Sequence, residues 1–375
     1  MLWIFWASVA FLAYTFAGYP LLLALMSLVR RQPHHRAPIR PTVSLIIPVH
    51  NEAGALREKI ENSLALRYPR EKLEIIIASD GSSDGSADLV RSFAHAGLKL
   101  VDIPERHGKH YAQMMARDVS SGEILVFTDV SVRLEETALE AMVSNFADPS
   151  VGCVSSEDQV MTGKGGVGEG LYVRLEMGLR RLEAGTGSLV GVSGSFFAAR
   201  RQICEVWHSN QSSDFFVPLH TVARGMRTVV DPEARGLYGT ARQEKAELYR
   251  KVRTVVNGLD VFFTHLELLH PFRHGFFSWQ LLSHKLCRWL VPFGFAALLI
   301  SSLFLWSHGW LYRATLVSLA ALLLSGFAAL SFRGLDSRIF RLAGFFLLGS
   351  AATVVAWLKF CSGERFVTWQ PTRRA

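Results

Sequence analysis

Long apolar stretches at both ends of the chain enclose one polar region. Residues 1–29 contain no Asp, Glu, Lys or Arg, and a helix needs about 20 apolar residues to cross a bilayer. Three further apolar stretches follow the polar region, at residues 290–306, 311–332 and 342–360. The pattern therefore predicts an N-terminal transmembrane helix at 1–29 and three C-terminal transmembrane helices within 290–361.

The polar region alternates between two kinds of pattern. Short β-branched runs typical of strands lie at residues 43–47, 73–78, 99–103 and 124–127. Helical patterns lie between and after them, at residues 53–66, 86–96, 109–120 and 135–146. Such alternation predicts an α/β domain with a mostly parallel, doubly wound sheet. We expect this domain to span residues 41–257.

Residues 258–289 mix apolar clusters with His and basic residues. This pattern is typical of amphipathic helices, either at the base of the polar domain or in the headgroup layer of a membrane. We favour the interfacial position.

Basic residues predict the orientation of the chain in the membrane. Four arginines follow the first apolar stretch, namely Arg30, Arg31, Arg36 and Arg40, and basic flanks tend to remain cytoplasmic. The large domain at residues 41–257 is therefore expected in the cytoplasm. The protein is expected to be integral to the inner or plasma membrane. The loop with Arg333, Arg338 and Arg341 agrees, and four spans then put the C-terminus outside. The basic tail residues argue for the opposite side: Lys359, Arg365, Arg373 and Arg374.

Composition narrows the classes of function. Hydrophobic residues make up 50% of the 375 residues, the net charge is +8 and the sequence pI is about 9.5. A basic chain suits anionic lipid or a phosphorylated substrate; nucleic acid is disfavoured, because the cations form no continuous stripe. The cysteines show no CxxC spacing, which speaks against a zinc site or a disulfide framework: Cys153, Cys204, Cys287 and Cys361.

Polar side chains follow three of the expected strands. Asn51 and Glu52 come after the first strand in a loop that contains Pro48, Asp80 and its neighbours follow the second, and Asp129 follows the fourth. The ligand crevice of an open α/β sheet lies at the carboxyl ends of its strands. These loops suit a nucleotide and a divalent cation, since hard cations prefer oxygen ligands. Each loop taken alone is equally typical of an ordinary turn or helix cap.

Asp214 precedes the apolar run Phe215–Leu219 and is expected at a helix start. There it could accept a proton from a hydroxyl nucleophile as a general base, or serve only as a helix cap. Five cations could neutralise a diphosphate leaving group, or belong to a solvated face: Arg106, Lys109, Arg250, Lys251 and Arg253.

Taken together, these segments resemble the membrane-integrated family 2 glycosyltransferases, the group of cellulose, chitin and hyaluronan synthases and related exopolysaccharide enzymes. The matching segments are Ile46-Ile47-Pro48-Val49-His50-Asn51-Glu52, Ser79-Asp80-Gly81-Ser82-Ser83-Asp84, Arg106-His107-Gly108-Lys109, Gly122-Glu123-Ile124, Phe127-Thr128-Asp129 and Gly194-Ser195-Phe196-Phe197-Ala198.

The resemblance implies a GT-A fold, a nucleotide-diphosphate sugar donor (usually a UDP sugar), Mg²⁺ or Mn²⁺, and a single displacement that inverts the anomeric carbon. It implies that Asp214 is the catalytic base, assisted by Arg253, and that Asp129 helps to hold the metal. The expected nucleotide-sugar-binding residues are Pro48, Asn51, Glu52, Asp80, Ser82, Asp84, Arg106, Lys109, Asp129 and Arg250.

The chain departs from the family pattern at three places. The DxD motif reads Asp129-Val130-Ser131, so the second carboxylate is missing. The acidic pair before the base reads Ser213-Asp214. The QxxRW motif of processive synthases is replaced by Arg250-Lys251-Val252-Arg253-Thr254, which speaks against long processive polymerisation.

The resulting prediction is transfer of a sugar to a growing polysaccharide or glycan at the membrane, with polysaccharide export or co-polymerase proteins as candidate partners. One alternative is the transfer of a single sugar to a polyprenyl phosphate lipid. Another is a non-catalytic, nucleotide-sugar-binding scaffold of a polysaccharide complex, which the missing second carboxylate motivates.

Overall fold

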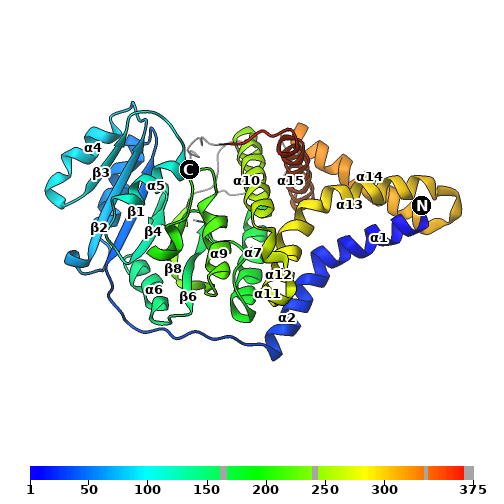
Figure 1. Ribbon diagram of the computed structural model, residues 1–375. Helices are drawn as coiled ribbons and strands as arrows, with labels where there is room; N and C mark the ends of the chain where they lie inside the picture. Colours follow the sequence, from blue (N-terminus) through cyan, green and yellow to red (C-terminus); the bar gives the residue numbers. More distant parts are fainter. Residues whose placement is uncertain (161–166, 239–243, 333–336, 367–375) are drawn as a thin grey trace.

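The computed structural model describes residues 1–160, 167–238, 244–332 and 337–366 (Figure 1). A mixed sheet forms one end of the molecule, and long apolar helices extend from the other end (Figure 1). Within the described residues the sheet has eight strands in the order β3-β2-β1-β4-β7-β6-β8-β5. The strands are β1 Val43–Val49, β2 Leu73–Asp80, β3 Lys99–Ile103, β4 Ile124–Thr128, β5 Val132–Leu134, β6 Val151–Val160, β7 Phe196–Arg200 and β8 Arg227–Tyr238.

The first half of the sheet is parallel, and its strands β1 and β4 are buried on both faces. Strands β3, β2, β1 and β4 run parallel, and every residue of β1 is buried. Side chains alternate across a strand, so Leu45 and Ile47 join one core cluster while Ile46 joins the other. Helix α3 (Ala53–Leu64) packs its apolar face on the first cluster and α5 (Lys109–Asp118) on the second. The predicted helix–sheet–helix layering is confirmed.

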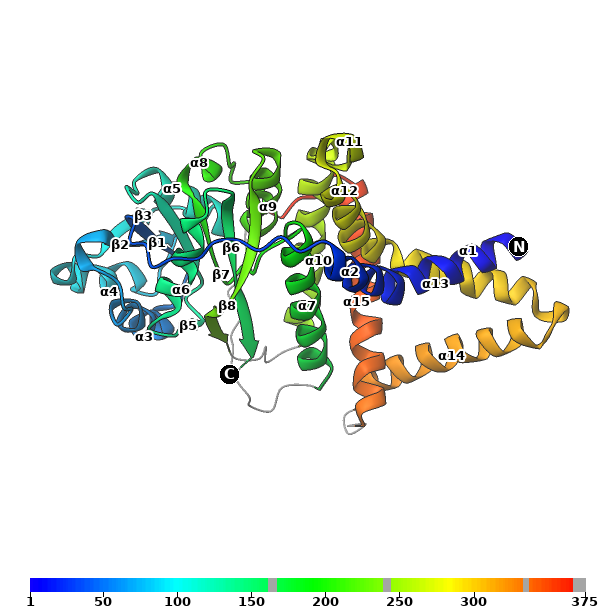
Figure 2. The same ribbon diagram turned by 90° about the horizontal axis from the view of Figure 1, so that it is seen from below.

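The second half of the sheet is mixed. Strand β7 runs antiparallel to both β4 and β6, β8 runs parallel to β6, and β5 pairs antiparallel with β8. The helices of the domain are completed by α4 (Ser86–Ser92), α6 (Ala138–Ser144), α7 (Val167–Thr186), α8 (Arg201–Cys204), α9 (Ser213–Ala223) and α10 (Glu244–Thr264). Helices α7 and α10 lie between the sheet and the apolar helices (Figures 1 and 2).

In the described parts of the chain, four helical segments are long and apolar enough to cross a membrane. The first, Leu2–Val29, consists of α1 (Leu2–Ala13), a π-helical turn (Tyr14–Gly18) and α2 (Tyr19–Val29). The second, Phe276–Phe304, consists of α12 (Phe276–Leu281), a π-helical turn (Leu282–Leu286) and α13 (Cys287–Phe304). The others are α14 (Trp310–Ser331) and α15 (Arg338–Cys361).

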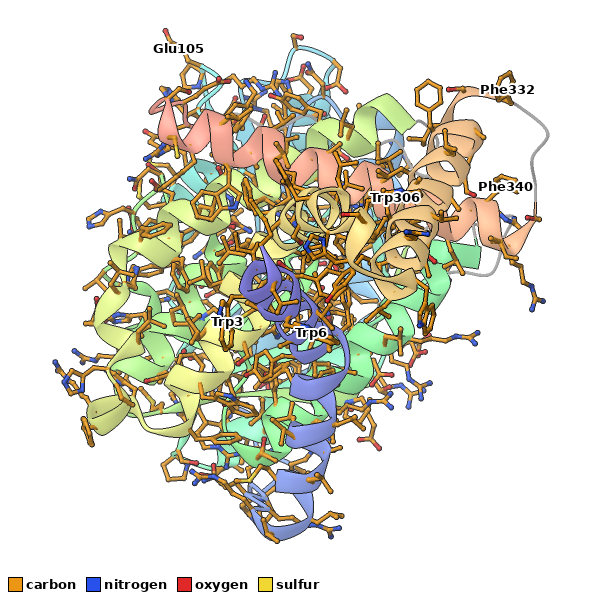
Figure 3. The ribbon with its side chains drawn as sticks, turned by 90° about the vertical axis from the view of Figure 1, so that its right-hand side faces the viewer. Trp3, Trp6, Glu105, Trp306, Phe332 and Phe340 are labelled. Carbon is orange, nitrogen blue, oxygen red and sulfur yellow. The ribbon has the colours of Figure 1, made fainter. Side chains whose placement is uncertain are left out.

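The apolar helices expose large aromatic side chains. Trp3 is 87% exposed and Phe332 is 64% exposed, and Figure 3 looks onto this end of the molecule with both residues labelled. Apolar surface of this kind is typical of contact with lipid. Arg333, Arg373 and Arg374, which entered the predicted orientation, lie outside the described residues.

The structure differs from the sequence pattern between residues 258 and 289. Helix α10 begins at Glu244 and ends at Thr264, and short helical turns follow at Leu266–Leu269 and Pro271–His274 (α11). From Phe276 the chain then runs as a helix without a break at residue 290. The structure thus divides residues 258–289 between the end of α10, short helical turns and the beginning of a long apolar helix.

Candidate active site

The loops after β1 and β2 are held together by side-chain hydrogen bonds. Asn51 has a positive φ of 52°, a conformation that Asn tolerates better than most residues. Its side-chain oxygen accepts from the amide of Ser83 at 2.8 Å, and Asp84 accepts from the amide of Ala53 at 2.8 Å. Ser82 accepts from the amide of Asn51 at 3.3 Å. These contacts bring three of the expected nucleotide-binding residues, Asn51, Ser82 and Asp84, to one edge of the sheet.

Asp80 is fully buried at the end of β2, and both of its carboxylate oxygens accept backbone hydrogen bonds. The donors are the amides of His107 at 2.7 Å and Gly108 at 2.8 Å. A Cβ on Gly81, the residue after Asp80, would lie 2.7 Å from the backbone nitrogen of Arg106. The carboxylate therefore fixes the loop that precedes α5, and with it the backbone that carries Arg106 and Lys109.

Lys109 connects two segments that are far apart in the sequence. Its Nζ lies 2.5 Å from Oδ1 of Asp129 and donates to the carbonyl oxygen of Gly194 at 3.0 Å. The amide of Asp129 in turn donates to the carbonyl oxygen of Ser195 at 3.1 Å. The loop after β4 and the loop before β7 are thus joined by the ammonium group of Lys109 and by one backbone hydrogen bond.

Glu52 and Asp129 lie close enough for their charges to interact. Burial, reinforced by the negative charge of Asp129, raises the pKa of Glu52 to about 7 from its ordinary value of 4.5. Two neighbouring carboxylates disfavour double ionisation, and a cation relieves their repulsion.

A buried lysine, Lys59, lies close to Asp129. Lys59 of α3 donates to Thr128 Oγ1 at 3.0 Å and to the carbonyl oxygen of Val132 at 2.7 Å. Burial lowers the pKa of Lys59 to about 7, although Asp129 acts in the opposite direction. Sequence reasoning missed Lys59, because a lysine within a helical pattern reads as a solvent-facing residue.

The residues around Asp129 fit a divalent cation that shares its ligands with a bound diphosphate. Asp129 is partly exposed and offers a hard oxygen ligand, and Glu52 adds negative charge beside it. Among the described residues no three His, Cys, Asp or Glu side chains are grouped to hold a metal. Oxygen atoms of a donor would therefore have to complete the coordination shell.

Asp214 lies in the first turn of α9, so the predicted helix start is confirmed. The hydroxyl of Ser212 donates to its Oδ1, and the backbone carbonyl of Asp214 accepts from the amide of Val192 at 3.0 Å. A Cβ on Gly194 would lie 2.8 Å from Oδ2 of Asp214. Only glycine allows this close approach, and Gly194 therefore contacts both Lys109 and Asp214.

A polar network packs behind the start of α9. Ser213 donates its hydroxyl to Gln113 Oε1 at 2.9 Å, and its amide lies 3.4 Å from Nδ1 of His110. Burial lowers the pKa of His110 to about 4, against the opposing charge of Asp214, so the ring is neutral at pH 7. The three-residue spacing of His110 and Gln113 on α5 was a signal for a shared helix face, which sequence reasoning did not use.

The basic cluster of α10 divides between two environments. The charges of Asp129 and Asp214 both act on Arg253, whose pKa is lowered chiefly by burial. Arg250 lies near enough to Arg253 to oppose its charge. Lys251 instead places its Nζ 4.3 Å from the ring centre of Phe345 on α15, so it faces the apolar helices.

Pro48 lies within β1 rather than in a loop, buried and paired in register with Ala78. The structure thus brings together Asp129, Lys109, Asp214 and Arg253, with Glu52 beside them. It gives Pro48 and Asp80 positions in which they support the loops.

Comparison with known proteins agrees with this geometry. The model of the family described as glycosyl transferase family 2 matches residues 44–207. Glycosyltransferase AglE of Haloferax volcanii is 31% identical over 134 residues, which cover 35% of this chain and 44% of that protein. Poly-beta-1,6-N-acetyl-D-glucosamine synthase of Staphylococcus aureus is 26% identical over 201 residues, which cover 51% of this chain and 48% of that protein. The chain spans about half the length of these curated relatives.

Among solved structures, the mannosyltransferase PcManGT from Pyrobaculum calidifontis, described in complex with GDP-Man and Mn²⁺, has a TM-score of 0.72 and 24% sequence identity to this chain. The similarity covers 96% of this chain and 100% of that chain. The two proteins share a fold, and the expected GT-A fold is confirmed.

Proposed function

Since residues 44–207 form a family 2 glycosyltransferase domain, we propose that the chain moves a sugar from a nucleotide-diphosphate sugar to an acceptor at a membrane, with inversion at the anomeric carbon. The observation that carries this proposal is the position of Gly194. Its carbonyl oxygen binds Lys109, the partner of Asp129, and its α-carbon lies against the carboxylate of Asp214. A donor site and a proton acceptor are therefore adjacent.

The donor would occupy the carboxyl edge of the sheet. The loops of Asn51 and of Ser82 to Asp84 would contact the nucleoside, with Glu52 beside them. Lys109, Arg253 and the neighbouring cations Arg106 and Arg250 would neutralise the diphosphate. Asp129 would hold a divalent cation, Mg²⁺ or Mn²⁺, whose contribution when bound is to stabilise negative charge on the departing diphosphate.

Asp214 would act as the general base. An acceptor oxygen attacks the anomeric carbon as its proton passes to the Asp214 carboxylate, and the bond to the diphosphate oxygen breaks with its electron pair. The hydroxyl of Ser212 donates to one carboxylate oxygen, which fixes the side chain and leaves the other oxygen against Gly194. Attack opposite to the leaving group inverts the anomeric carbon.

We also propose a donor, an acceptor, partner proteins and a side of the membrane. A UDP sugar is the donor that the sequence predicts, and the GDP-Man complex of PcManGT adds GDP-mannose to the donors worth testing. The S. aureus relative, a poly-N-acetylglucosamine synthase by name, supports a growing glycan as acceptor, with export or co-polymerase partners. We place the domain on the cytoplasmic side, because arginines follow the first apolar helix.

The test is nucleotide release by the full-length protein in detergent. UDP-glucose, UDP-galactose, UDP-N-acetylglucosamine, UDP-glucuronate and GDP-mannose would each be supplied with Mn²⁺ or with EDTA. We expect one donor to release its nucleoside diphosphate, and EDTA to slow that release by about tenfold or more. Nucleotide binding without release from any donor would favour the non-catalytic scaffold instead.

A specific contact favours a second acceptor class, a lipid that carries phosphate. The ammonium of Lys285, on the second apolar helix, lies 5.0 Å from the ring centre of Phe215, the residue after Asp214.

A further inference from the structure

Lys285 is a partly buried cation that has no ion-pair partner among the described residues. It lies in the long apolar helix Phe276–Phe304, where that helix packs against the family 2 domain. Across the part of the chain that the structure describes, its Nζ contacts the face of Phe215, and no carboxylate lies within ion-pairing distance. Removing a charge from water without a partner is costly. Ionisable residues in membrane segments are usually paired or mark a path for a substrate.

The nearby carboxylates are engaged by other groups. Oε1 of Glu183 accepts from the Tyr19 hydroxyl at 2.5 Å and lies 2.6 Å from Nδ1 of His284. Oε2 of Glu176 accepts from Arg288 at 2.7 Å. Burial alone would raise the pKa of Glu176, but Arg288 and His284 outweigh it and hold that pKa well below its ordinary value. This network joins α2, α7 and the helix of Lys285, and leaves the ammonium of Lys285 outside it.

The backbone is irregular at the same place. Lys285 lies in the π-helical turn Leu282–Leu286, and single π-helical turns within α-helices occur frequently at functional sites. A second π-helical turn, Tyr14–Gly18, lies beside it, because the hydroxyls of Tyr14 and Ser283 are 2.6 Å apart. Lys285 is the fourth residue of the turn Leu282–Leu286.

The ammonium of Lys285 lies near the proposed base, Asp214. A Cβ on Gly191 would lie 3.2 Å from Nζ of Lys285 and 3.8 Å from the carbonyl oxygen of Asp214. Gly191 therefore lies between the ammonium of Lys285 and the first turn of α9, close to both. On its other side, Asp214 faces Gly194 and the donor residues. Lys285 thus lies on the membrane side of Asp214.

From these contacts we propose that Lys285 binds the phosphate group of a lipid-linked acceptor at the membrane surface, and so places a hydroxyl group of that acceptor, which gives up its proton on attack, beside Asp214. An ammonium acts on phosphate as a point charge, and an anion is the partner that the described part of the protein does not supply to Lys285. The lipid tail would follow the apolar helix on which Lys285 lies. This inference rests on the proposed function, because it names the acceptor of the same site.

The test is equilibrium binding to the full-length protein in detergent, without a sugar donor. The probes are farnesyl phosphate, farnesol, inorganic phosphate and phosphatidylglycerol. We expect Lys285→Met to weaken the binding of farnesyl phosphate by about tenfold or more, the size of one lost charged contact, and to leave the binding of farnesol unchanged. The control is Lys359→Met, which removes an ammonium that pairs with Glu364 at the end of α15.

Equal binding of farnesyl phosphate by Lys285→Met and the unaltered protein would overturn the proposal. So would inorganic phosphate or phosphatidylglycerol that binds as tightly as farnesyl phosphate, because the site would then take free anions or any headgroup. If Lys285→Met does not fold, Lys285→Gln serves instead, because it removes the charge and keeps a polar end, and unchanged binding of farnesyl phosphate by a folded Lys285→Gln variant contradicts the site. If farnesyl phosphate binds in a way that depends on Lys285, but no donor releases its nucleotide, the proposed transferase activity is rejected and the proposed phosphate site is retained.

Discussion

The ammonium of Lys109 lies 2.5 Å from Oδ1 of Asp129 and also binds the carbonyl oxygen of Gly194 at 3.0 Å. One side chain of α5 thus joins the end of β4 to the segment that contacts Asp214. The site depends on this contact for its charge balance, because Asp129 and Glu52 are neighbouring carboxylates and Lys109 lowers the pKa of Glu52.

Removal of that ammonium is expected to weaken the donor site. Lys109→Met should lower kcat/KM for the donor by about ten- to a hundredfold, equivalent to about 1.4–2.7 kcal/mol. The loss should fall mainly on KM if Lys109 binds the diphosphate before the reaction. The measurement is steady-state nucleotide release. Lys99→Met is the matched control, because Lys99 pairs with Glu74 at a half-exposed position on β3; an equal loss in both variants would contradict a role for Lys109.

The raised pKa of Glu52 predicts a pH-dependent stability. The folded protein holds the Glu52 proton more tightly than the unfolded chain, so ionisation opposes folding as pH rises from 4.5 to about 7. Glu52→Gln removes this penalty. Its unfolding temperature without ligand should therefore exceed that of the unaltered protein at pH 8, and the difference should disappear near pH 4.5.

The control for this experiment is Glu58→Gln on the same helix, where the side chain is 77% exposed. We expect the unfolding temperature of that variant to follow the unaltered protein at each pH. A Glu52→Gln variant that is less stable at pH 8 would contradict the assigned pKa.

The buried carboxylate of Asp80 predicts a loss of stability on amidation. Asp80→Asn keeps one acceptor oxygen but turns an NH₂ group toward a backbone amide, so one amide of His107 or Gly108 loses its partner. The free energy of unfolding should fall by about 2 kcal/mol, measured by chemical denaturation. Asp102→Asn is the comparison, because the partly exposed pair of Asp102 with Arg91 should contribute under about 1 kcal/mol. An equal loss of unfolding free energy in the two variants would show that the buried contacts of Asp80 contribute no more than an exposed ion pair.

The parallel half of the sheet could be predicted because its strands are continuous β-branched runs. The structure confirms the run at 99–103 without change and extends the first two strands to Val49 and Asp80. Parallel strands are buried on both faces and give this strong signal. Strands β5 to β8 give a weaker one: β6 contains the buried polar residues Ser155 and Ser156, and β5 has three residues.

The contacts that assemble the candidate site could not be predicted, because they join distant segments. Nothing in the local pattern places Gly194 against Asp214, or Lys59 behind Asp129. The contacts of the helix Phe276–Phe304 with α7 were unpredictable for the same reason. Its charged residues His284 and Arg288 suggested an interfacial helix, but Glu176 and Glu183 of α7 meet them in the folded protein.

The most direct test of the account is the turnover of Asp214→Asn. This variant keeps the shape of the side chain and removes the proton acceptor, so the release of nucleotide from the active donor should fall by about a hundredfold or more. Nucleotide binding should remain within about twofold of the unaltered protein, since a base acts on the acceptor and not on the donor. The exposed Asp88→Asn on α4 should match the unaltered protein in both. Asp214→Asn that turns over at the unaltered rate would contradict the assignment of Asp214 as the base, and with it the proposed mechanism.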